Sequence, residues 1–122
     1  MAERTTREVV SDHLHQAVEG DIETDLRRNY ASDLVVLTGF GVFHGHEGLR
    51  EVNRLLQRQL PGATYQYRTQ LDAGEIAFLE WSAQTDSTQV TDGVDTYHVR
   101  DGRIHLQTIH YTPTPTMNQD SC

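Results

Sequence analysis

The sequence predicts an α+β domain in which about three helices cover the concave face of a curved, cone-shaped antiparallel sheet. Two observations indicate this class. Apolar residues recur at helical spacing in the first half of the chain, whereas the second half alternates apolar and polar residues between glycine-containing turns. Side chains alone do not fill the cone that such a sheet forms, so a cavity is expected between sheet and helices.

Three segments have the pattern of amphipathic helices. The first spans about residues 6–19 and ends at Gly20, a second short helix follows Asp21, and a third spans about residues 47–60 before Pro61. The expected buried stripes contain Val9, Val10, His13, Leu14, Ala17 and Val18 in the first helix, Ile22, Leu26 and Tyr30 in the second, and Leu49, Val52, Leu56 and Leu60 in the third.

Six segments are predicted as strands, and the last four form an antiparallel meander because hairpin turns connect them. The predicted strands are residues 34–37, 42–43, 63–71, 75–85, 94–100 and 103–111. The polar residues 86–93 are expected to form a longer connection. One folded domain is predicted over residues 1–111. Residues 112–122, with two prolines and few apolar side chains, are expected to be a flexible tail.

Composition and charge exclude several classes of function. The net charge of −8 argues against binding to nucleic acid or to anionic membranes. All ten basic residues are arginine, which excludes a Schiff-base lysine. The single cysteine, Cys122, provides no thiolate metal cage. No segment has the apolar length of a membrane span or a signal peptide, so a cytoplasmic protein is expected.

Several short motifs follow one another in an order typical of one family. They are Glu19-Gly20-Asp21, Tyr30-Ala31-Ser32-Asp33, His44-Gly45-His46-Glu47-Gly48, Gly93-Val94-Asp95-Thr96-Tyr97 and Arg100-Asp101-Gly102-Arg103-Ile104. With these motifs, about residues 6–111 resemble the SnoaL-like branch of the nuclear transport factor 2 superfamily. The resemblance implies the cone-shaped fold. It leaves the activity open, because this fold hosts cyclases, isomerases, hydrolases and noncatalytic binders.

Ketosteroid isomerase, a relative within the superfamily, uses an aspartate base and an oxyanion hole made by a tyrosine and a second aspartate. Counting from the motifs gives the equivalent positions in this sequence. Thr38 stands where the base would be, His13 where the tyrosine would be, and Asp95 where the second aspartate would be. Threonine cannot replace the base, which argues against steroid isomerisation. SnoaL-type cyclases, which depend on an aspartate at the Asp95 position, resemble the chain better.

Asp95 and His13 are the predicted catalytic residues. Asp95 shares a strand face with Tyr97 and Val99, and burial in an apolar cavity would raise its pKa into the range of an acid or base. His13 lies on the apolar face of the first helix and would form an acid–base dyad with Asp95 if the two approach within hydrogen-bond reach. The alternatives are a solvated aspartate and a core histidine bonded to a backbone carbonyl.

The expected pocket wall follows from strand alternation and from the resemblance. In the last strand, His105, Gln107, Ile109 and Tyr111 should face inward, and Ile104, Leu106, Thr108 and His110 outward, where this fold often forms homodimers. A shift of one residue would exchange the two sets. The predicted substrate-binding residues are Tyr97, Tyr111, Gln107, Trp81, Tyr30 and Thr38, although plain packing is the alternative for Trp81 and Tyr30.

No metal or cofactor is expected, because His44 and His46 lack the further ligands that a zinc site needs. The predicted function is that of a cofactor-free acid–base enzyme, of the cyclase or isomerase type, acting on a small apolar carbonyl compound. Asp95 would move the proton, and His13 would orient it or stabilise an oxyanion. The alternative is a noncatalytic module for small-molecule binding or dimerisation.

Overall fold

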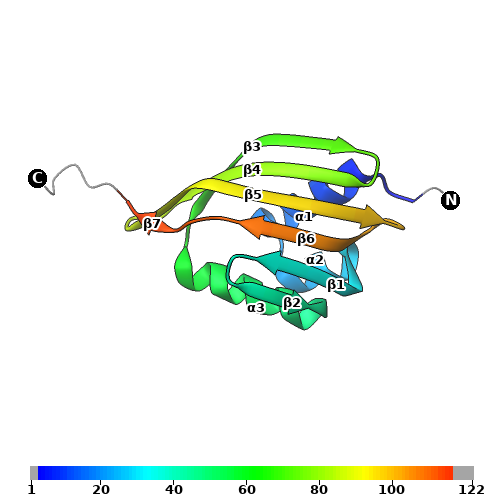
Figure 1. The fold of residues 1–122 in the computed structure, drawn as a ribbon, viewed down its shortest axis with the longest axis horizontal. Coiled ribbons are helices and arrows are strands. Elements are labelled where there is room, and N and C mark those ends of the chain that lie inside the picture. Colours follow the sequence, from blue (N-terminus) through cyan, green and yellow to red (C-terminus); the bar gives the residue numbers. More distant parts are fainter. Residues whose placement is uncertain (1–2, 117–122) are drawn as a thin grey trace, which may run out of the picture.

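The computed structural model describes residues 3–116 and contains three helices and a seven-stranded sheet (Figure 1). The helices are α1 (Thr6–Glu19), α2 (Ile22–Asn29) and α3 (Gly45–Gln59). The strands are β1 (Tyr30–Thr38), β2 (Gly41–His44), β3 (Thr64–Ala73), β4 (Ile76–Gln84), β5 (Thr88–Arg100), β6 (Arg103–His110) and β7 (Thr114–Pro115). The predicted α+β class is confirmed. Within the described residues, no helix is long and apolar enough to cross a membrane.

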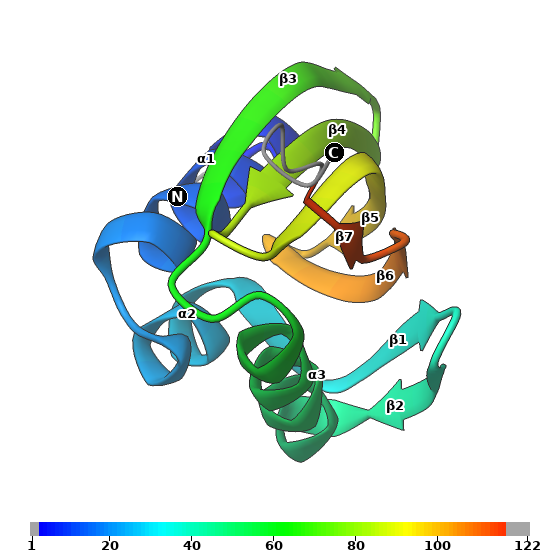
Figure 2. The same cartoon turned by 90° about the vertical axis from the view of Figure 1, so that its left-hand side faces the viewer.

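The six long strands form one curved sheet in the order β2-β1-β6-β5-β4-β3. All three helices lie on its concave side (Figure 2). Every neighbouring pair in this order is antiparallel except β1 and β6, which run parallel. The sheet is therefore mixed, because β1 pairs with a strand far along the chain as well as with its neighbour β2.

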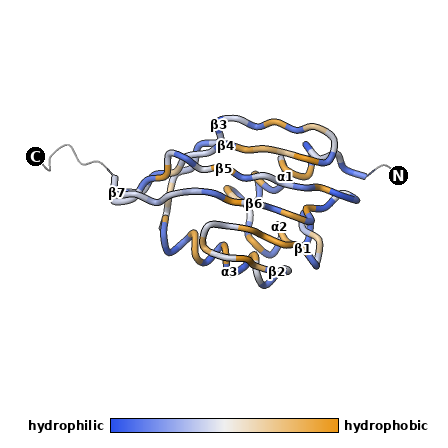
Figure 3. Tube along the Cα trace, in the orientation of Figure 1, coloured by the Kyte–Doolittle hydropathy of each residue, from blue (hydrophilic) through white to orange (hydrophobic). Residues whose placement is uncertain are grey.

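The first two helices begin where a side chain caps the helix, whereas the N-cap residue of α3, His44, makes no side-chain capping hydrogen bond. Thr5 accepts a hydrogen bond from the Glu8 amide at 3.1 Å, and the Glu8 carboxylate accepts one from the Thr5 amide at 2.7 Å, which is a capping box. Asp21 caps α2 by accepting from the Thr24 amide at 2.7 Å. Along α3 apolar residues recur at every third or fourth position among polar ones, as an amphipathic helix requires (Figure 3). Its buried stripe faces the sheet.

The segment predicted as a long polar connection is mostly strand. β5 already begins at Thr88, and Val90, which pairs with Ala83 of β4, is fully buried. A register shift between Trp81 and Ala83 marks an irregularity that hides the alternation from the sequence. β7, in the segment predicted as a tail, pairs with the start of β5. Residues 117–122, including Cys122, lie outside the described part of the chain.

The last strand departs from the predicted alternation at its first two positions after Arg103. His105, predicted to face inward, does not line the pocket and lies beside the exposed Asp33. Ile104 was expected to face outward but is fully buried, whereas Gln107, Ile109 and Tyr111 are buried as expected. The cause is a bulge, because Val99 pairs with Ile104 and the preceding residue of β5 pairs with Leu106. The extra residue in β6 restarts the alternation, so that Ile104 and Gln107 face the same side.

Trp81 of β4 lies directly over Gly93 of β5, its partner in the sheet. A Cβ atom on Gly93 would lie 2.4 Å from two carbons of the Trp81 indole and 2.8 Å from the Trp81 carbonyl oxygen. Only glycine therefore allows the indole to lie flat against β5. The position of the indole matters because its ring nitrogen reaches toward the next residues of the same strand.

We predict that Gly93→Ala lowers the free energy of unfolding by about 1–3 kcal/mol, because the indole must leave its position or the strands must separate. Gly39→Ala is the matched control, since a Cβ at that glycine meets no atom within 4 Å. Urea denaturation of both variants measures the difference. Equal stability of the two variants would contradict the close packing of Trp81 on Gly93.

Candidate functional site

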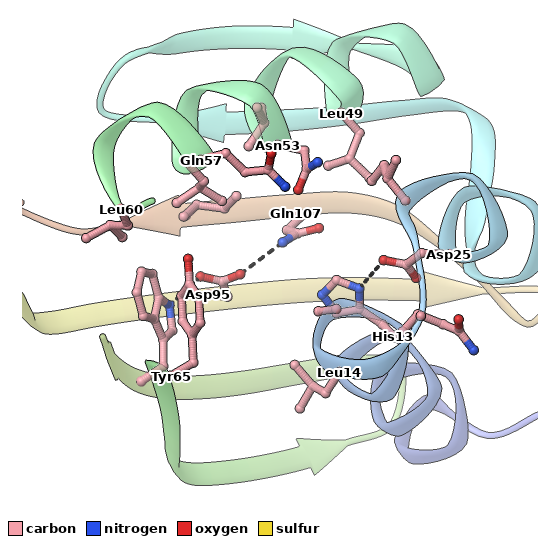
Figure 4. Close-up of a pocket in the computed structure, with 18 of the residues that line it drawn as sticks. His13, Leu14, Asp25, Leu49, Asn53, Gln57, Leu60, Tyr65, Asp95 and Gln107 are labelled. Carbon is pink, nitrogen blue, oxygen red and sulfur yellow. Dashed lines mark hydrogen bonds and ion pairs between the residues drawn. The ribbon is translucent and has the colours of Figure 1, made fainter. Parts of the chain in front are cut away.

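A pocket of about 620 Å³ lies between the three helices and the concave face of the sheet (Figure 4). Its apolar wall includes Leu14, Ile22, Leu49, Leu56, Leu60, Leu79 and Ile109. Among the predicted site residues, the wall includes His13, Tyr30, Trp81, Asp95, Tyr97 and Gln107. An apolar pocket with a few converging polar groups is the usual form of a small-molecule site.

Asp95 of β5 is only 7% exposed and is held by three donors. The Trp81 indole N–H donates to Oδ1 at 2.8 Å. The Gln107 amide donates to Oδ2 at 2.9 Å, and the Tyr97 hydroxyl donates to the same oxygen at 3.1 Å. The solvated aspartate considered as an alternative is therefore not what the structure contains.

Two opposing effects act on this carboxyl. Burial raises the pKa of Asp95 above its ordinary value, because the charged form loses water. The hydrogen bonds from Trp81 and Gln107, the nearby His13 and the Tyr97 hydroxyl oppose the rise, because each stabilises the carboxylate. Burial is the larger effect. Asp95 can therefore change its protonation state at a higher pH than an exposed aspartate.

His13 of α1 is bonded to a carboxylate that the sequence reading did not single out. Its Nδ1 lies 2.7 Å from Oδ2 of Asp25 in α2, and Asp25 is only 3% exposed. The second oxygen of Asp25 accepts a hydrogen bond from the Asn29 amide at 2.8 Å. The predicted alternative, a histidine bonded to a backbone carbonyl, is thus replaced by a buried ion pair.

No direct hydrogen bond or ion pair joins His13 to Asp95 in the described structure. Two side chains connect them instead. The Tyr30 hydroxyl lies 3.4 Å from His13 Nδ1 and donates to the Gln107 carbonyl oxygen at 2.5 Å. The other end of the Gln107 amide donates to Asp95. The two predicted catalytic residues face one pocket, but they do not form a direct dyad.

The pKa of His13 is raised by its surroundings. Burial alone would lower the pKa of His13. The charge and the hydrogen bond of Asp25 raise it, the charges of Asp95 and Asp12 raise it further, and together they outweigh burial. The protonated imidazole is therefore favoured at a higher pH than in an exposed histidine. Its other ring nitrogen, Nε2, has no hydrogen-bond partner among residues 3–116.

Several residues of the pocket were missed by the sequence reading. Asp25 and Asn29 lie on the same helix face as Ile22, Leu26 and Tyr30, and polar residues within an apolar stripe were the signal that could have found them. The wall also includes two tyrosines of β3 and two amides of α3, which are Tyr65, Tyr67, Asn53 and Gln57. The tyrosines share a strand face two residues apart.

These four side chains leave polar groups free for a ligand. The tyrosine hydroxyls that are hydrogen-bonded belong to Tyr30, Tyr97 and Tyr111, whereas those of Tyr65 and Tyr67 have no partner within the described residues. Burial raises the pKa of Tyr67 to about 12, so its hydroxyl stays a neutral donor at physiological pH. In Figure 4, Asn53 and Gln57 point from α3 toward the space above Gln107.

Two predicted binding residues lie away from this pocket. The Thr38 hydroxyl closes the turn after β1, donating to the Gly41 carbonyl at 3.2 Å and accepting from the Phe40 amide at 2.8 Å. Tyr111 packs its ring on Trp81, with 5.6 Å between ring centres, and donates a hydrogen bond to Gln59 of α3. Thr38 is thus used by the turn, and Tyr111 supports the wall from behind Trp81.

Of the two histidines at the start of α3, His46 is hydrogen-bonded to a distant backbone group, whereas the His44 side chain forms no capping hydrogen bond. His46 Nε2 lies 3.1 Å from the backbone carbonyl oxygen of Tyr30, and His44 stands at the N-terminal cap of the helix. In the described part of the chain, no three His, Cys, Asp or Glu side chains are grouped as a metal site.

We predict that Trp81→Phe destabilises the protein more as the pH rises. The lost N–H stabilises the carboxylate of Asp95 but does little for the protonated acid, and the raised pKa of Asp95 makes native stability fall as pH rises through that pKa. The pH-dependent part of the loss should reach about 1.5–3 kcal/mol. Urea denaturation between mildly acidic and mildly alkaline pH measures it.

Tyr65→Phe is the control for this variant, because Tyr65 packs beside Trp81 with 5.6 Å between ring centres but does not bond to Asp95. Its effect on stability should not grow with pH. A pH-independent loss in Trp81→Phe would mean that only packing was removed.

Comparison with known proteins places this chain in a family. Residues 10–106 match the SnoaL-like domain family. Among similar structures, IdmH of Streptomyces antibioticus, a candidate polyketide cyclase, is 20% identical with a TM-score of 0.71, and 88% of this chain and 92% of IdmH are covered. An NTF2-like protein of unknown function from Cytophaga hutchinsonii is 16% identical with a TM-score of 0.71, covering 91% and 93%.

A de novo designed protein with a curved β-sheet has a TM-score of 0.74 at 19% identity, covering 92% of this chain and 88% of the design. No protein of curated function matches the sequence significantly. The likeness to solved structures establishes the fold, and the family match covers most of the sequence. The chain belongs to the SnoaL-like family.

Proposed function

We propose that this protein binds a small, mostly apolar carbonyl compound in the pocket and catalyses a proton transfer on it without a cofactor. The reaction would be of the cyclase or isomerase type. Asp95 takes a proton from a carbon next to the carbonyl group and returns it elsewhere, while His13 stabilises the negative oxygen that develops.

The observation that carries the proposal is the burial of Asp95 in the pocket wall. A carboxyl in the wall of an apolar pocket, with its pKa raised by burial, is suited to general acid–base catalysis. The apolar leucines of α1 and α3 favour a ligand with an apolar body. The similarity of the fold to a candidate polyketide cyclase is consistent with this chemistry.

One observation favours a second candidate, a noncatalytic binding protein. Three donors already hold the Asp95 oxygens, and hydrogen bonds to a carboxylate weaken it as a base. In that case Asp95 would serve to position the donors that line the pocket. The same pocket would then bind a ligand without turnover.

We predict that Asp95→Asn abolishes turnover while leaving ligand affinity within a few-fold of the parent, because asparagine has nearly the same shape but cannot accept the proton. The assay is incorporation of deuterium from heavy water into a panel of small aryl ketones and β-diketones, followed by proton NMR. Binding of the same compounds is measured by calorimetry.

Asp33→Asn is the matched control, since this aspartate lies on β1 with its side chain 84% exposed and outside the pocket. It should exchange deuterium at the parent rate. Binding without exchange in the parent, in Asp33→Asn and in Asp95→Asn would favour the noncatalytic protein instead.

We also propose that two copies of the chain pair through the outer face of the sheet. One row of cross-strand neighbours on that face crosses the sheet from edge to edge and contains Val42, Leu37, Thr108, Thr96, Phe78 and Leu71. The apolar side chains of Leu37, Val42 and Leu71 are 42%, 60% and 59% exposed. The exposed apolar side chains lie at the two ends of this row, with two threonines between them, and exposed apolar side chains of this kind are suited to burial against a symmetry mate.

We predict that Leu37→Glu converts a dimer into a monomer, because two buried carboxylates would face each other or lack partners across the interface. Sedimentation velocity measures the change. Val18→Glu is the control, since Val18 is 63% exposed but lies on α1, away from the sheet. A parent protein that is monomeric at micromolar concentration would overturn the dimer.

A further inference from the structure

The pocket has an unusual balance of charge. Three aspartates, Asp21, Asp25 and Asp95, contribute to its wall, and His13 is its basic side chain. The sequence has no lysine, and no arginine of the described residues lines the pocket. Any positive charge that a ligand meets in this pocket must therefore come from His13.

Asp25 is held firmly in place below His13. Asp25 and Asn29 are 3% and 0% exposed, and the Asn29 amide donates to the Asp25 oxygen that His13 leaves free. The Asn29 carbonyl oxygen in turn accepts a hydrogen bond from the Arg4 guanidinium at 2.8 Å. A carboxylate fixed in this way has one oxygen directed at Nδ1 of the imidazole.

This arrangement determines which ring nitrogen of His13 meets a ligand. Nδ1 is taken up by Asp25, with the Tyr30 hydroxyl as a second neighbour. The opposite nitrogen, Nε2, points into the space between His13 and Asp95 (Figure 4). A carboxylate bonded to one imidazole nitrogen keeps a proton there and fixes the tautomer.

We propose that Asp25 is a positioning residue that directs the Nε2–H of a protonated His13 into the pocket, where it binds an anionic oxygen on an otherwise apolar ligand. The ligand class is an enolate or a phenolate. The inference rests on the proposed function for the location of the ligand, but it requires only binding and no turnover.

Nε2 of His13 can donate a hydrogen bond to the ligand only when His13 is protonated. When His13 is protonated, both ring nitrogens carry protons, and the Nε2–H is free to donate. When it loses one proton, Asp25 retains the other on Nδ1, so Nε2 becomes a bare acceptor that repels an anionic oxygen. Affinity for an anion should therefore fall as pH rises through the pKa of His13, which lies above its ordinary value.

The other groups that face His13 are consistent with this pH dependence. Asp12 of α1, Asp25 of α2 and Asp95 of β5 all favour its protonated form. Tyr30 of β1 and Tyr97 of β5 pack edge-on against the imidazole, with 5.6 and 5.5 Å between ring centres. Burial raises the pKa of both tyrosines well above the ordinary value, so they stay neutral.

Pentafluorophenol and pentafluorotoluene are suitable probes, because they share one ring and the first is an anion in mildly acidic buffer. Fluorine NMR measures the dissociation constant of each across neutral pH. NMR titration gives the pKa of His13. Below that pKa the parent protein should bind the phenolate more tightly than pentafluorotoluene, and above it this preference should disappear. The preference should be about tenfold or more.

Asp25→Asn should lower the pKa of His13, because the buried imidazolium loses its counter-ion, and should move the loss of phenolate preference to the same lower pH. Glu23→Gln is the matched control, since it removes a carboxylate of the same helix that bonds to Arg50 rather than to His13. It should behave as the parent.

His13→Gln provides a second test if Asp25→Asn does not fold. Glutamine retains an N–H donor near the position of Nε2 but cannot titrate, so its phenolate affinity should not change with pH over this range. The proposal is overturned if the parent shows no phenolate preference, if His13→Gln keeps the parent's pH dependence, or if a folded Asp25→Asn leaves the His13 pKa and the preference unchanged.

The two proposals can fail separately. A phenolate preference governed by His13, together with no deuterium exchange in any ketone, would leave the anion site standing and overturn the enzyme. Exchange that depends on Asp95, with no phenolate preference, would leave the enzyme standing and overturn the role of Asp25.

Discussion

Two carboxylates, Asp25 and Asp95, are buried on the concave side of the sheet without an arginine or lysine beside them, and hydrogen bonds from neighbouring side chains stabilise them. An unpartnered buried carboxylate is too costly to keep ionised in a protein of this size. Asp95 receives hydrogen bonds from Trp81, Tyr97 and Gln107, and Asp25 is bonded by His13 and Asn29. Within the described residues, no buried side-chain nitrogen or oxygen lacks a partner.

The hydrogen bonds to the buried carboxylate of Asp95 depend on features of the sheet. Trp81 can bring its N–H to Asp95 only because Gly93 leaves room for the indole. Gln107 serves both Tyr30 and Asp95 with the two ends of one amide, which its inward position opposite Tyr97 in the sheet allows. A packing feature of the sheet and a polar network of the pocket therefore depend on the same few residues.

The sequence predicted the parts of this structure that depend on local pattern. Helical spacing, the caps and the glycine-containing turns located the helices and most strands, and the motifs led to Asp95 and His13. Features that depend on distant contacts were beyond its reach. The pairing of β1 with β6 joins segments far apart in the sequence. The bulge before Leu106 comes from one added residue in β6, which local pattern does not reveal.

Asp25 was missed for a related reason. Taken alone, an aspartate in a short helix is expected to face water, and only its position beside Ile22 and Leu26 indicates burial. A dyad of His13 with Asp95 was expected only if the two came within hydrogen-bond reach, and the structure pairs His13 with Asp25 instead. Spacing along the chain can place two residues on one cavity, but it does not determine which of two carboxylates an imidazole will meet.

The separation of the two carboxylates has a chemical consequence for the proposed reaction. With Asp25 paired to a protonated His13, a proton that moves from a ligand carbon to Asp95 changes a carboxylate and a neutral ligand into a neutral acid and an enolate. The total charge of the pocket stays the same, and the negative charge moves from Asp95 to an oxygen near the imidazolium. A buried site can carry out such a transfer without paying a new desolvation cost, because the charge is moved rather than created. Direct contact between His13 and Asp95 would instead hold the negative charge on Asp95 and oppose that movement, so the indirect link through Tyr30 and Gln107 favours the chemistry more than the predicted dyad would.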